Sequence, residues 1–161
     1  MILTQFKITD VRAREIIDGR GTPTVEVDIW VDSFLRGRAD VPCGRSKGTH
    51  EAFELRDGGE RYAGFGVRKA IDNINKIIAP EMMGKDVRDQ RKLDNLMIEM
   101  DDTQNKAKLG ANAIVGVSLA IAKAAACSLR IPLYQYINTN AYILPVPVLD
   151  LVEGGMLAAS E

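Results

Sequence analysis

The N-terminal quarter of the chain alternates apolar and polar residues with the two-residue period of β-strands. Residues 8–17 and 24–31 predict two strands, and the second run has valine or isoleucine at every other position. Residues 18–23 between them contain aspartate, glycine and proline, which predicts a turn and therefore an antiparallel hairpin. A third short strand is predicted over residues 36–41, after a turn at residues 33–36, so the three strands would form a meander.

The pattern becomes helical after residue 66. Apolar residues three or four positions apart predict amphipathic helices over residues 67–80, where a proline ends the pattern, and over residues 93–100. A longer helix is predicted over residues 111–129, with small residues at every fourth position from Gly116 to Ala124. Small residues let a neighbouring element approach closely, so this helix should lie at the buried centre of the domain.

The rest of the chain predicts a short helix and an extended connection. Pro132 begins a helix that reaches Tyr136, and residues 141–151 are expected to be extended because they contain two prolines. An apolar strand is predicted over residues 146–152. The whole pattern indicates an α+β fold, in which a three-stranded antiparallel meander is followed by a helical bundle.

The charge, hydropathy and cysteine content of the chain indicate which kinds of binding partner and cellular compartment to expect. The 161 residues carry 21 basic and 22 acidic side chains, interspersed along the chain, which predicts no nucleic-acid-binding face. The most apolar stretch, residues 109–127, is interrupted by Asn112 and Lys123, so we expect burial against protein and no membrane span. Cys43 and Cys127 lack a cysteine-rich framework, and we expect both to be reduced thiols of a cytoplasmic protein.

The main chemical signal lies in a glycine-rich loop after the third predicted strand. Gly44 and Gly48 have no Cβ and allow the backbone to approach a ligand, while Arg45 and Lys47 add positive charge. Ser46 supplies a hydroxyl and a carbonyl oxygen, which are ligands that Mg²⁺ accepts. This composition fits a lid over a phosphate or carboxylate group, and it equally fits an exposed turn.

The same loop contains the G-x-S-x-G pattern of a hydrolase nucleophile elbow. Such an elbow needs a histidine base brought in from a distant part of the chain. The sole histidine, His50, lies four residues after Ser46 on the same short segment. We therefore exclude serine hydrolase chemistry.

Three segments carry a family pattern. They read D-G-R-G-T-P-T-V-E-V at residues 18–27, E-A-F-E-L-R-D-G at residues 51–58 and L-G-A-N-A-I-V-G-V-S-L-A at residues 109–120. In order and spacing they resemble the N-terminal domain of enolase (phosphopyruvate hydratase) of the archaeal and bacterial type. The resemblance implies a capping domain over residues 1–140, followed over residues 141–161 by a connector and the first strand of a truncated barrel.

The resemblance also implies an activity. Enolases are Mg²⁺-dependent lyases that convert 2-phosphoglycerate, a small phosphorylated anion, to phosphoenolpyruvate in glycolysis and gluconeogenesis. The family's catalytic residues and its tighter metal site belong to the barrel, so this chain should hold no catalytic residue and should be inactive alone. Its contribution would be the lid: Gly44, Arg45, Lys47 and Gly48 would close over the substrate, and Ser46 would bind the second Mg²⁺.

Members of this family form dimers in which the N-terminal hairpin of one subunit meets the barrel of its partner. By resemblance, we expect Arg14, Arg20 and Glu26 to make such contacts in a homo-oligomer. The alternative is that these residues are exposed strand charges of little energetic consequence.

The chain departs from the family near the expected active site. The family lid reads S-G-A-S-T-G, whereas residues 43–48 read C-G-R-S-K-G, and Leu157 stands where the family has a histidine. A leucine can neither donate a hydrogen bond nor carry a proton. Two interpretations remain open: the lid domain of an enolase-type lyase, or part of a divergent enolase-like protein with another substrate or no catalysis, in which the domain serves dimer assembly.

Overall fold

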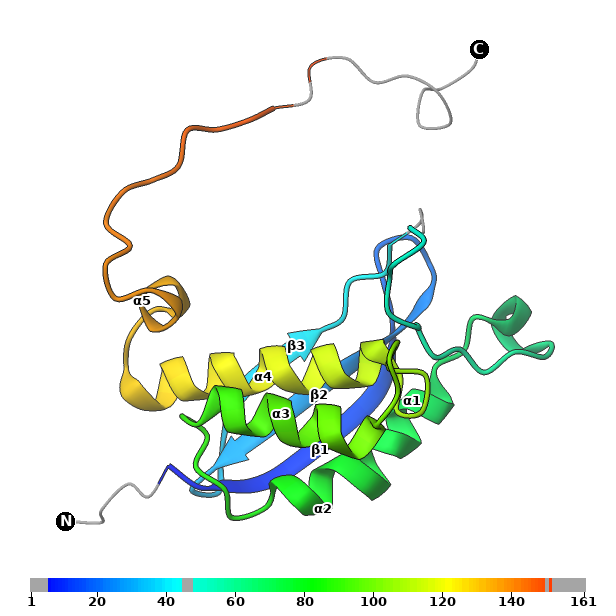
Figure 1. The fold of residues 1–161 in the computed structure, drawn as a ribbon, viewed down its shortest axis with the longest axis horizontal. Coiled ribbons are helices and arrows are strands. Elements are labelled where there is room, and N and C mark those ends of the chain that lie inside the picture. The colour runs from blue at the N-terminus through cyan, green and yellow to red at the C-terminus, as the bar shows by residue number, and fades with distance from the viewer. Residues whose placement is uncertain (1–5, 45–47, 150, 152–161) are drawn as a thin grey trace.

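The chain folds into a three-stranded sheet with helices on one face. The computed structural model describes residues 6–44, 48–149 and 151 (Figure 1). The strands β1 (Ile8–Ile17), β2 (Pro23–Val31) and β3 (Phe34–Asp40) are antiparallel, in the order β1-β2-β3. The predicted α+β class and the meander are confirmed.

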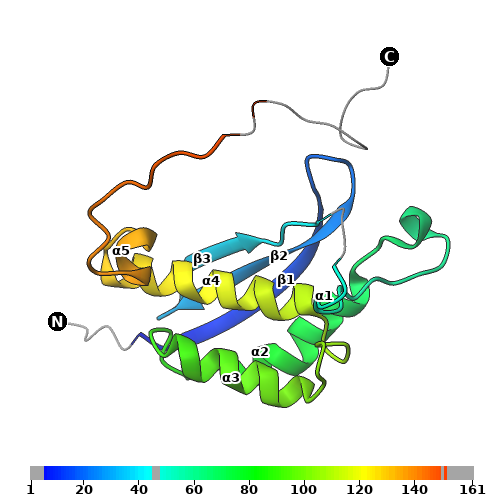
Figure 2. The ribbon, with the colours of Figure 1, turned by 45° about the horizontal axis from the view of Figure 1, so that its top comes forward.

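The helices follow the sheet in sequence. They are the 3₁₀-helix η1 (Arg61–Gly64), α1 (Arg68–Asn73), the π-helical turn η2 (Ile74–Ile78), α2 (Ala79–Met82), α3 (Gln90–Asp101), α4 (Ala111–Leu129) and α5 (Leu133–Ile137). Helix α4 crosses β2 and β3, while α1, η2 and α2 lie over β1 (Figures 1 and 2). Helix α3 packs beside α4 on the same face, so one side of the sheet faces the helical layer.

The turn between β1 and β2 is stabilised by its own aspartate. The carboxylate of Asp18 accepts hydrogen bonds from the backbone N–H groups of Arg20 at 2.9 Å and Thr22 at 2.8 Å. Gly21 has a φ of +78°, which L-residues with a side chain rarely adopt. The turn predicted at residues 18–23 is therefore formed and joins β1 to β2 as a hairpin.

The second turn is tighter than predicted, and β3 begins at Phe34 instead of residue 36. Asp32 and Ser33 have φ values of +51° and +69°, the left-handed conformation that closes a two-residue hairpin. The N–H of Ser33 also donates to the hydroxyl of Thr9 at 2.9 Å. Because neither turn residue is glycine, the sequence carries only a weak signal for this turn.

The helical run after residue 67 continues past Pro80, contrary to the prediction. Helix α1 passes into η2, and η2 leads into α2 with Pro80 in its first turn. Proline is tolerated in a first helical turn, where its missing N–H removes no required hydrogen bond. The wider π turn thereby separates Pro80 from the hydrogen-bond ladder of α1 and lets the run reach Met82.

Helix α4 is the buried centre of the domain, as predicted. A Cβ on Gly37 of β3 would lie 2.1 Å from the carbonyl oxygen of Ala120 and 2.8 Å from Cβ of Ala124, so the strand touches the helix backbone. Gly116 also makes a close approach, with 2.9 Å from a Cβ at this position to the side chain of Val27. By length and composition α4 could cross a membrane, with a mean hydropathy of 1.6, and its packing in the core accounts for that apolar character.

The opposite face of the sheet carries a cluster of charged side chains. Asp28, whose side chain is 2 % exposed, accepts hydrogen bonds from Arg38 at 2.6 and 2.9 Å and from Arg14 at 2.5 Å. Burial would raise the pKa of Asp28, but the hydrogen bonds from Arg38 and Arg14 outweigh it and hold that pKa below its usual range. Arg14 also pairs with Glu26 on the same strand as Asp28.

The strand predicted over residues 146–152 is not formed in the described part of that segment. Residues 144–149 and 151 have no regular structure, and their apolar side chains, such as Val146 and Val148, are almost fully exposed. A strand needs a neighbour that satisfies its backbone N–H and C=O groups. No described segment makes a backbone hydrogen bond to these residues, which extend away from the helices in Figure 1.

We expect Gly37→Ala to destabilise the fold by about 2–3 kcal/mol, because its Cβ would overlap backbone atoms of α4 that move only with the helix. Gly19→Ala is the matched control, since a Cβ there meets no atom within 4 Å. Urea denaturation of both variants measures the difference. Equal stability of the two variants would contradict the close packing of β3 on α4.

A partly buried ion pair joins the sheet to the segment before α1. Arg61 donates two hydrogen bonds to the carboxylate of Glu15 on β1, and the N–H of Val67 donates a third at 3.0 Å. The hydrogen bonds from Arg61 are the main cause that lowers the pKa of Glu15 to about 2, with the N–H of Val67 adding to it against the opposing effect of burial. Glu15 is therefore charged in the folded protein at all but very acidic pH.

Glu15→Gln should cost about 2 kcal/mol of unfolding free energy at neutral pH, because it removes the charge from these hydrogen bonds. The folded pKa of Glu15 lies below its ordinary value of 4.5, so its contribution is complete above about pH 4.5 and is lost as pH falls toward 2. Denaturation of wild type and variant from pH 7 to pH 2.5 should show the difference shrinking. Asp72→Asn is the control, because its pair with Lys76 is solvent-exposed; a Glu15→Gln effect that does not change with pH would refute the assignment.

Candidate functional site

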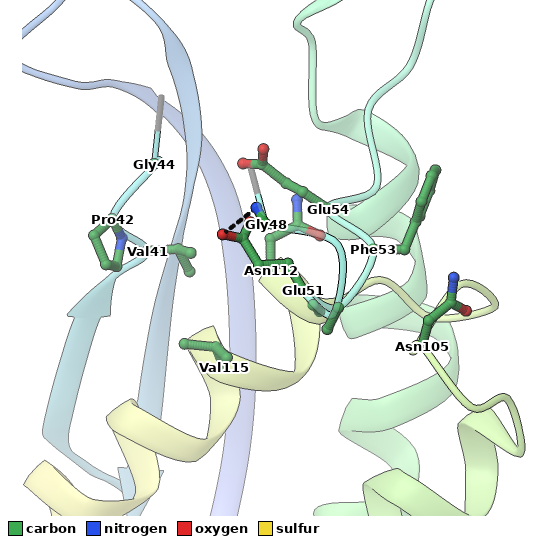
Figure 3. Close-up of a pocket in the computed structure, with 12 residues that line it drawn as sticks. Val41, Pro42, Gly44, Gly48, Glu51, Phe53, Glu54, Asn105, Asn112 and Val115 are labelled. Carbon is green, nitrogen blue, oxygen red and sulfur yellow. Dashed lines mark hydrogen bonds between the residues drawn. The ribbon is translucent and has the colours of Figure 1, made fainter. Parts of the chain in front are cut away.

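A pocket of about 310 Å³ lies where the end of β3, the segment that follows the glycine-rich loop, and the start of α4 meet (Figure 3). We call residues 51–55 of that segment the arm. The lining residues are Val41, Pro42, Gly44, Gly48, Glu51, Ala52, Phe53, Glu54, Asn105, Ala111, Asn112 and Val115. Figure 3 shows Val41, Pro42 and Gly44 on one side and Glu51, Phe53 and Glu54 on the other, with α4 beneath them.

The β3 side of the pocket is fixed to the sheet. The N–H of Val41 donates to the carbonyl of Val25 at 2.9 Å, which extends the ladder between β2 and β3 by one residue. The hydroxyl of Thr24 donates to the carbonyl of Val41 at 2.6 Å and is itself buried. The chain therefore enters the glycine-rich loop from a rigid strand end.

The arm side is fixed to the start of α4 and to the loop before it. The N–H of Phe53 donates to the carbonyl of Asn105 at 2.7 Å, and the N–H of Ala111 donates to the carbonyl of Phe53 at 2.8 Å. The side chain of Asn112 binds both the N–H and the carbonyl of Leu55. The arm thus runs in an extended path across the N-terminal end of the helix.

Two of the predicted lid residues line this pocket. Gly44 lies on its β3 side, and the N–H of Gly48 donates to the carboxylate of Glu51 at 2.9 Å. Arg45, Ser46 and Lys47 lie outside the described residues. Their predicted roles therefore stay predictions.

His50 lies in an exposed turn between the loop and the arm. It is not among the residues that line the pocket. No group of three His, Cys, Asp or Glu side chains within the described parts of the chain could hold a metal ion. The pocket can accept a ligand between its walls, and any metal there needs ligands from elsewhere.

Arg56 joins the start of the glycine-rich loop to the hairpin, the arm and the segment before α1. It donates to the carbonyls of Pro23 and Phe65 at 2.6 Å each, to Glu54 at 2.6 Å and to the Cys43 sulfur at 3.0 Å. A planar guanidinium is suited to this role because its donors point in fixed directions. A second cavity of about 390 Å³ lies beside this contact, between the hairpin turn and the arm.

The residues predicted to contact a partner subunit make contacts within the chain. Arg14 and Glu26 belong to the charged cluster on the outer face of the sheet, where Glu26 is largely buried. Arg20 lies in the hairpin turn and donates to the carbonyl of Cys43 at 3.2 Å, at the start of the glycine-rich loop. Arg14 remains 42 % exposed, so part of its surface is open to a partner.

Comparison with known proteins decides the family. The family model described as "Enolase, N-terminal domain" matches residues 8–137. The chain belongs to the enolase family. It is 61 % identical over 157 residues to the Enolase of Thermococcus kodakarensis and, over the same length, to that of Thermococcus gammatolerans. The Enolase of Pyrococcus furiosus is 59 % identical over 157 residues.

Each of these alignments covers 97 % of this chain and 36 % of the relative. The chain therefore spans about a third of the length of the enolases that it matches. The matched range of the family model contains the sheet, the helices up to α5, and both walls of the pocket. The recognition of an enolase N-terminal domain from three sequence segments is confirmed.

Sequence reasoning missed two residues at these cavities. Asn112, which lines the pocket, draws attention only as an interruption of an apolar stretch, although it is 5 % exposed and binds the arm. Arg56, which lines the second cavity, is one of many charged residues in the sequence, and three of its four partners come from other segments of the chain. A polar residue within an otherwise apolar helix start is the one signal that points to Asn112, since buried polar groups need partners.

Proposed function

We propose that this chain is the capping domain of an enolase-type lyase, which converts 2-phosphoglycerate to phosphoenolpyruvate. The observation that carries the proposal is the identity of about 60 % to archaeal enolases over nearly the whole chain. The pocket supports it, because Gly44 and Gly48, the two glycines that flank the predicted lid residues, line a cavity of about 310 Å³. The reaction would belong to glycolysis and gluconeogenesis in the cytoplasm.

In this proposal the loop at residues 43–48 is the lid, and Arg45 and Lys47 attract the phosphorylated substrate. Ser46 supplies oxygen ligands to the second Mg²⁺, whose charge would stabilise the enolate formed in the reaction. The hydroxyl and carbonyl oxygens of Ser46 are hard ligands from a single residue, and the described residues form no metal cluster of their own. The fit is thus that of one contributing residue, with the remaining ligands and the catalytic groups in the barrel.

The proposal includes the assignment of residues 1–140 to the capping domain and of residues 141–161 to the connector and the first barrel strand. The exposed apolar side chains of residues 143–149 support it, since such residues are covered in a complete domain. It also includes a homo-oligomer in which Arg14, Arg20 and Glu26 face a partner barrel. The partly exposed guanidinium of Arg14 supports that contact.

The alternative is a divergent enolase-like protein with another substrate or no catalysis. The observations that favour it are Leu157, in place of the family's histidine, and the two added charges of the loop. These positions also offer the test that separates the two proposals. In a protein that joins this domain to its barrel, Leu157→His with Arg45→Ala and Lys47→Thr should increase turnover of 2-phosphoglycerate if these departures define a changed function.

The 161-residue chain alone should show no turnover of 2-phosphoglycerate with Mg²⁺, because the groups that move protons would lie in the barrel. In a protein that joins this domain to its barrel, Ser46→Ala should lower kcat/KM by about 10–100-fold through weakened metal binding. His50→Ala is the control and should change it little. The absorbance of phosphoenolpyruvate measures each rate, and an equal loss in both variants would remove the special role of Ser46.

Arg45→Ala combined with Lys47→Ala should raise KM for 2-phosphoglycerate severalfold in the same longer protein, because two charges that attract the anion are lost. The effect should shrink as salt is added, since exposed charges are screened over about 10 Å at ~0.1 M ionic strength. Steady-state kinetics at low and high salt give both quantities. A KM that is unchanged at low salt would show that these side chains do not meet the substrate.

A further inference from the structure

Two asparagine side chains each bind both backbone polar groups of one distant residue. Asn112, in the first turn of α4, accepts a hydrogen bond from the N–H of Leu55 at 3.1 Å and donates one to its carbonyl at 3.0 Å. Asn75, in η2, makes the same pair with Ala13 of β1 at 2.8 and 3.1 Å. Each amide takes the place of a neighbouring strand.

Ala13 and Leu55, the residues that the two asparagines bind, differ in their other backbone contacts. Ala13 lies within β1, where it is also paired with Val27 of β2. Leu55 lies in the arm, which is not part of a strand, and no other backbone hydrogen bond to Leu55 occurs among the described residues. Asn112 therefore supplies the hydrogen bonds that hold the backbone of Leu55, whose side chain packs against the core.

Phe53 gives the arm a second attachment to the start of α4 and to the loop before it. The N–H of Phe53 donates to Asn105, and the carbonyl of Phe53 accepts from Ala111 at the helix start. Phe53 itself is 47 % exposed, so side-chain burial holds it only weakly. Loss of the Asn112 bonds would leave one backbone hydrogen bond between the arm and α4, from Ala111 to Phe53, and one from Phe53 to Asn105 in the loop before the helix.

The arm lies so close to the helix that the intervening residue must be glycine. Gly110 has a φ of +96°, and a Cβ there would lie 2.6 Å from Cβ of Leu55 and 2.7 Å from the Oδ1 atom of Asn112. The Asn112 side chain, which is 5 % exposed, is thus enclosed between the helix start and the arm. Its hydrogen bonds are partly buried, and a replacement that cannot form them would leave the N–H and the carbonyl of Leu55 without these partners.

We propose that Asn112 is a positioning residue of the pocket, which holds the arm at a fixed distance from the β3 side. Glu51, Phe53 and Glu54 of the arm form one wall of that pocket, and the carboxylate of Glu51 in turn holds the N–H of Gly48. The path runs from Asn112 through Leu55 to Glu51 and Gly48. Its consequence for substrate binding rests on the proposed function, whereas its consequence for the arm does not.

The first test measures the arm itself, by hydrogen exchange of individual amides in the 161-residue chain. The N–H of Phe53 bonds to Asn105 and touches neither asparagine side chain, so it reports the position of the arm. Its exchange, taken relative to that of Val117 at the centre of α4, should be about tenfold faster in Asn112→Ala. The control Asn75→Ala removes the same two kinds of hydrogen bond and should leave the ratio unchanged. A wild-type ratio in Asn112→Ala would overturn the proposal.

A second variant keeps the volume of the side chain if alanine impairs folding. In Asn112→Asp the carboxylate can accept from the N–H of Leu55, but it faces the carbonyl of Leu55 without a proton to donate. Protonation of that carboxyl restores the donor, so the ratio of Phe53 to Val117 exchange should return toward wild type as pH falls. A ratio that stays at the wild-type value at every pH would overturn the role of the amide as a donor.

The second test measures function in the protein that joins this domain to its barrel, at a temperature where both variants are folded. Asn112→Ala should raise KM for 2-phosphoglycerate about tenfold relative to Asn75→Ala, because the arm no longer holds its wall of the pocket. A purely structural role would leave KM as in the control and would overturn the functional part. If the unaltered longer protein does not act on 2-phosphoglycerate, the proposed function fails, and the exchange result still decides whether Asn112 positions the arm.

Discussion

Strand β3 and helix α4 touch through backbone atoms at Gly37, and the positions of the other elements follow from this contact. A side chain at residue 37 would overlap the carbonyl of Ala120, so the helix axis lies closer to the sheet than ordinary side chains permit. Gly116, also on α4, repeats the approach next to Val27 and Val41. Because closely packed interiors do not yield by small amounts, these glycines fix both the height and the direction of α4 over β2 and β3.

The direction of α4 brings its first turn to the end of β3, and this meeting creates the pocket. The arm comes from between β3 and η1 in sequence and has no strand to pair with. Its backbone groups are satisfied by Ala111 and Asn112 of α4 and by Asn105 in the preceding loop. The packing of the core therefore sets the distance between the two walls, since one wall continues β3 and the other is held by α4.

The outer face of the sheet is held by charge instead of apolar packing. Asp28 is almost fully buried there between Arg14 and Arg38, and either arginine alone would leave its carboxylate poorly compensated. The pair of Glu15 with Arg61 holds the segment before α1 to β1 in the same way. In the function proposed above, the outer face of the sheet and the exposed residues after α5 would be surfaces on which the rest of a longer protein or a second subunit packs.

The sequence by itself determined the class of fold, the hairpin and the long central helix. Alternation over residues 8–17, the turn residues around Asp18 and the small-residue spacing of α4 are local patterns, and local patterns report the period of the backbone. They also carried the family motif, because the residues of the hairpin and of the α4 start are contiguous in sequence. The boundary of β3 and the run past Pro80 were predicted less well, since non-glycine residues at positive φ and a π turn leave little trace in composition.

The tertiary structure alone decided how the pocket is built. Asn112 and Leu55 are 57 residues apart in the sequence. Arg56 forms hydrogen bonds with the hairpin, the start of the glycine-rich loop and the segment before α1. Such contacts depend on where α4 lies over the sheet, which no local period encodes. The same holds for Asp28 and Glu15, whose burial and pairing appear only when strands and loops meet. Residue type shows that a group can donate or accept a hydrogen bond, but its partner is set by the packing of segments that are distant in the chain.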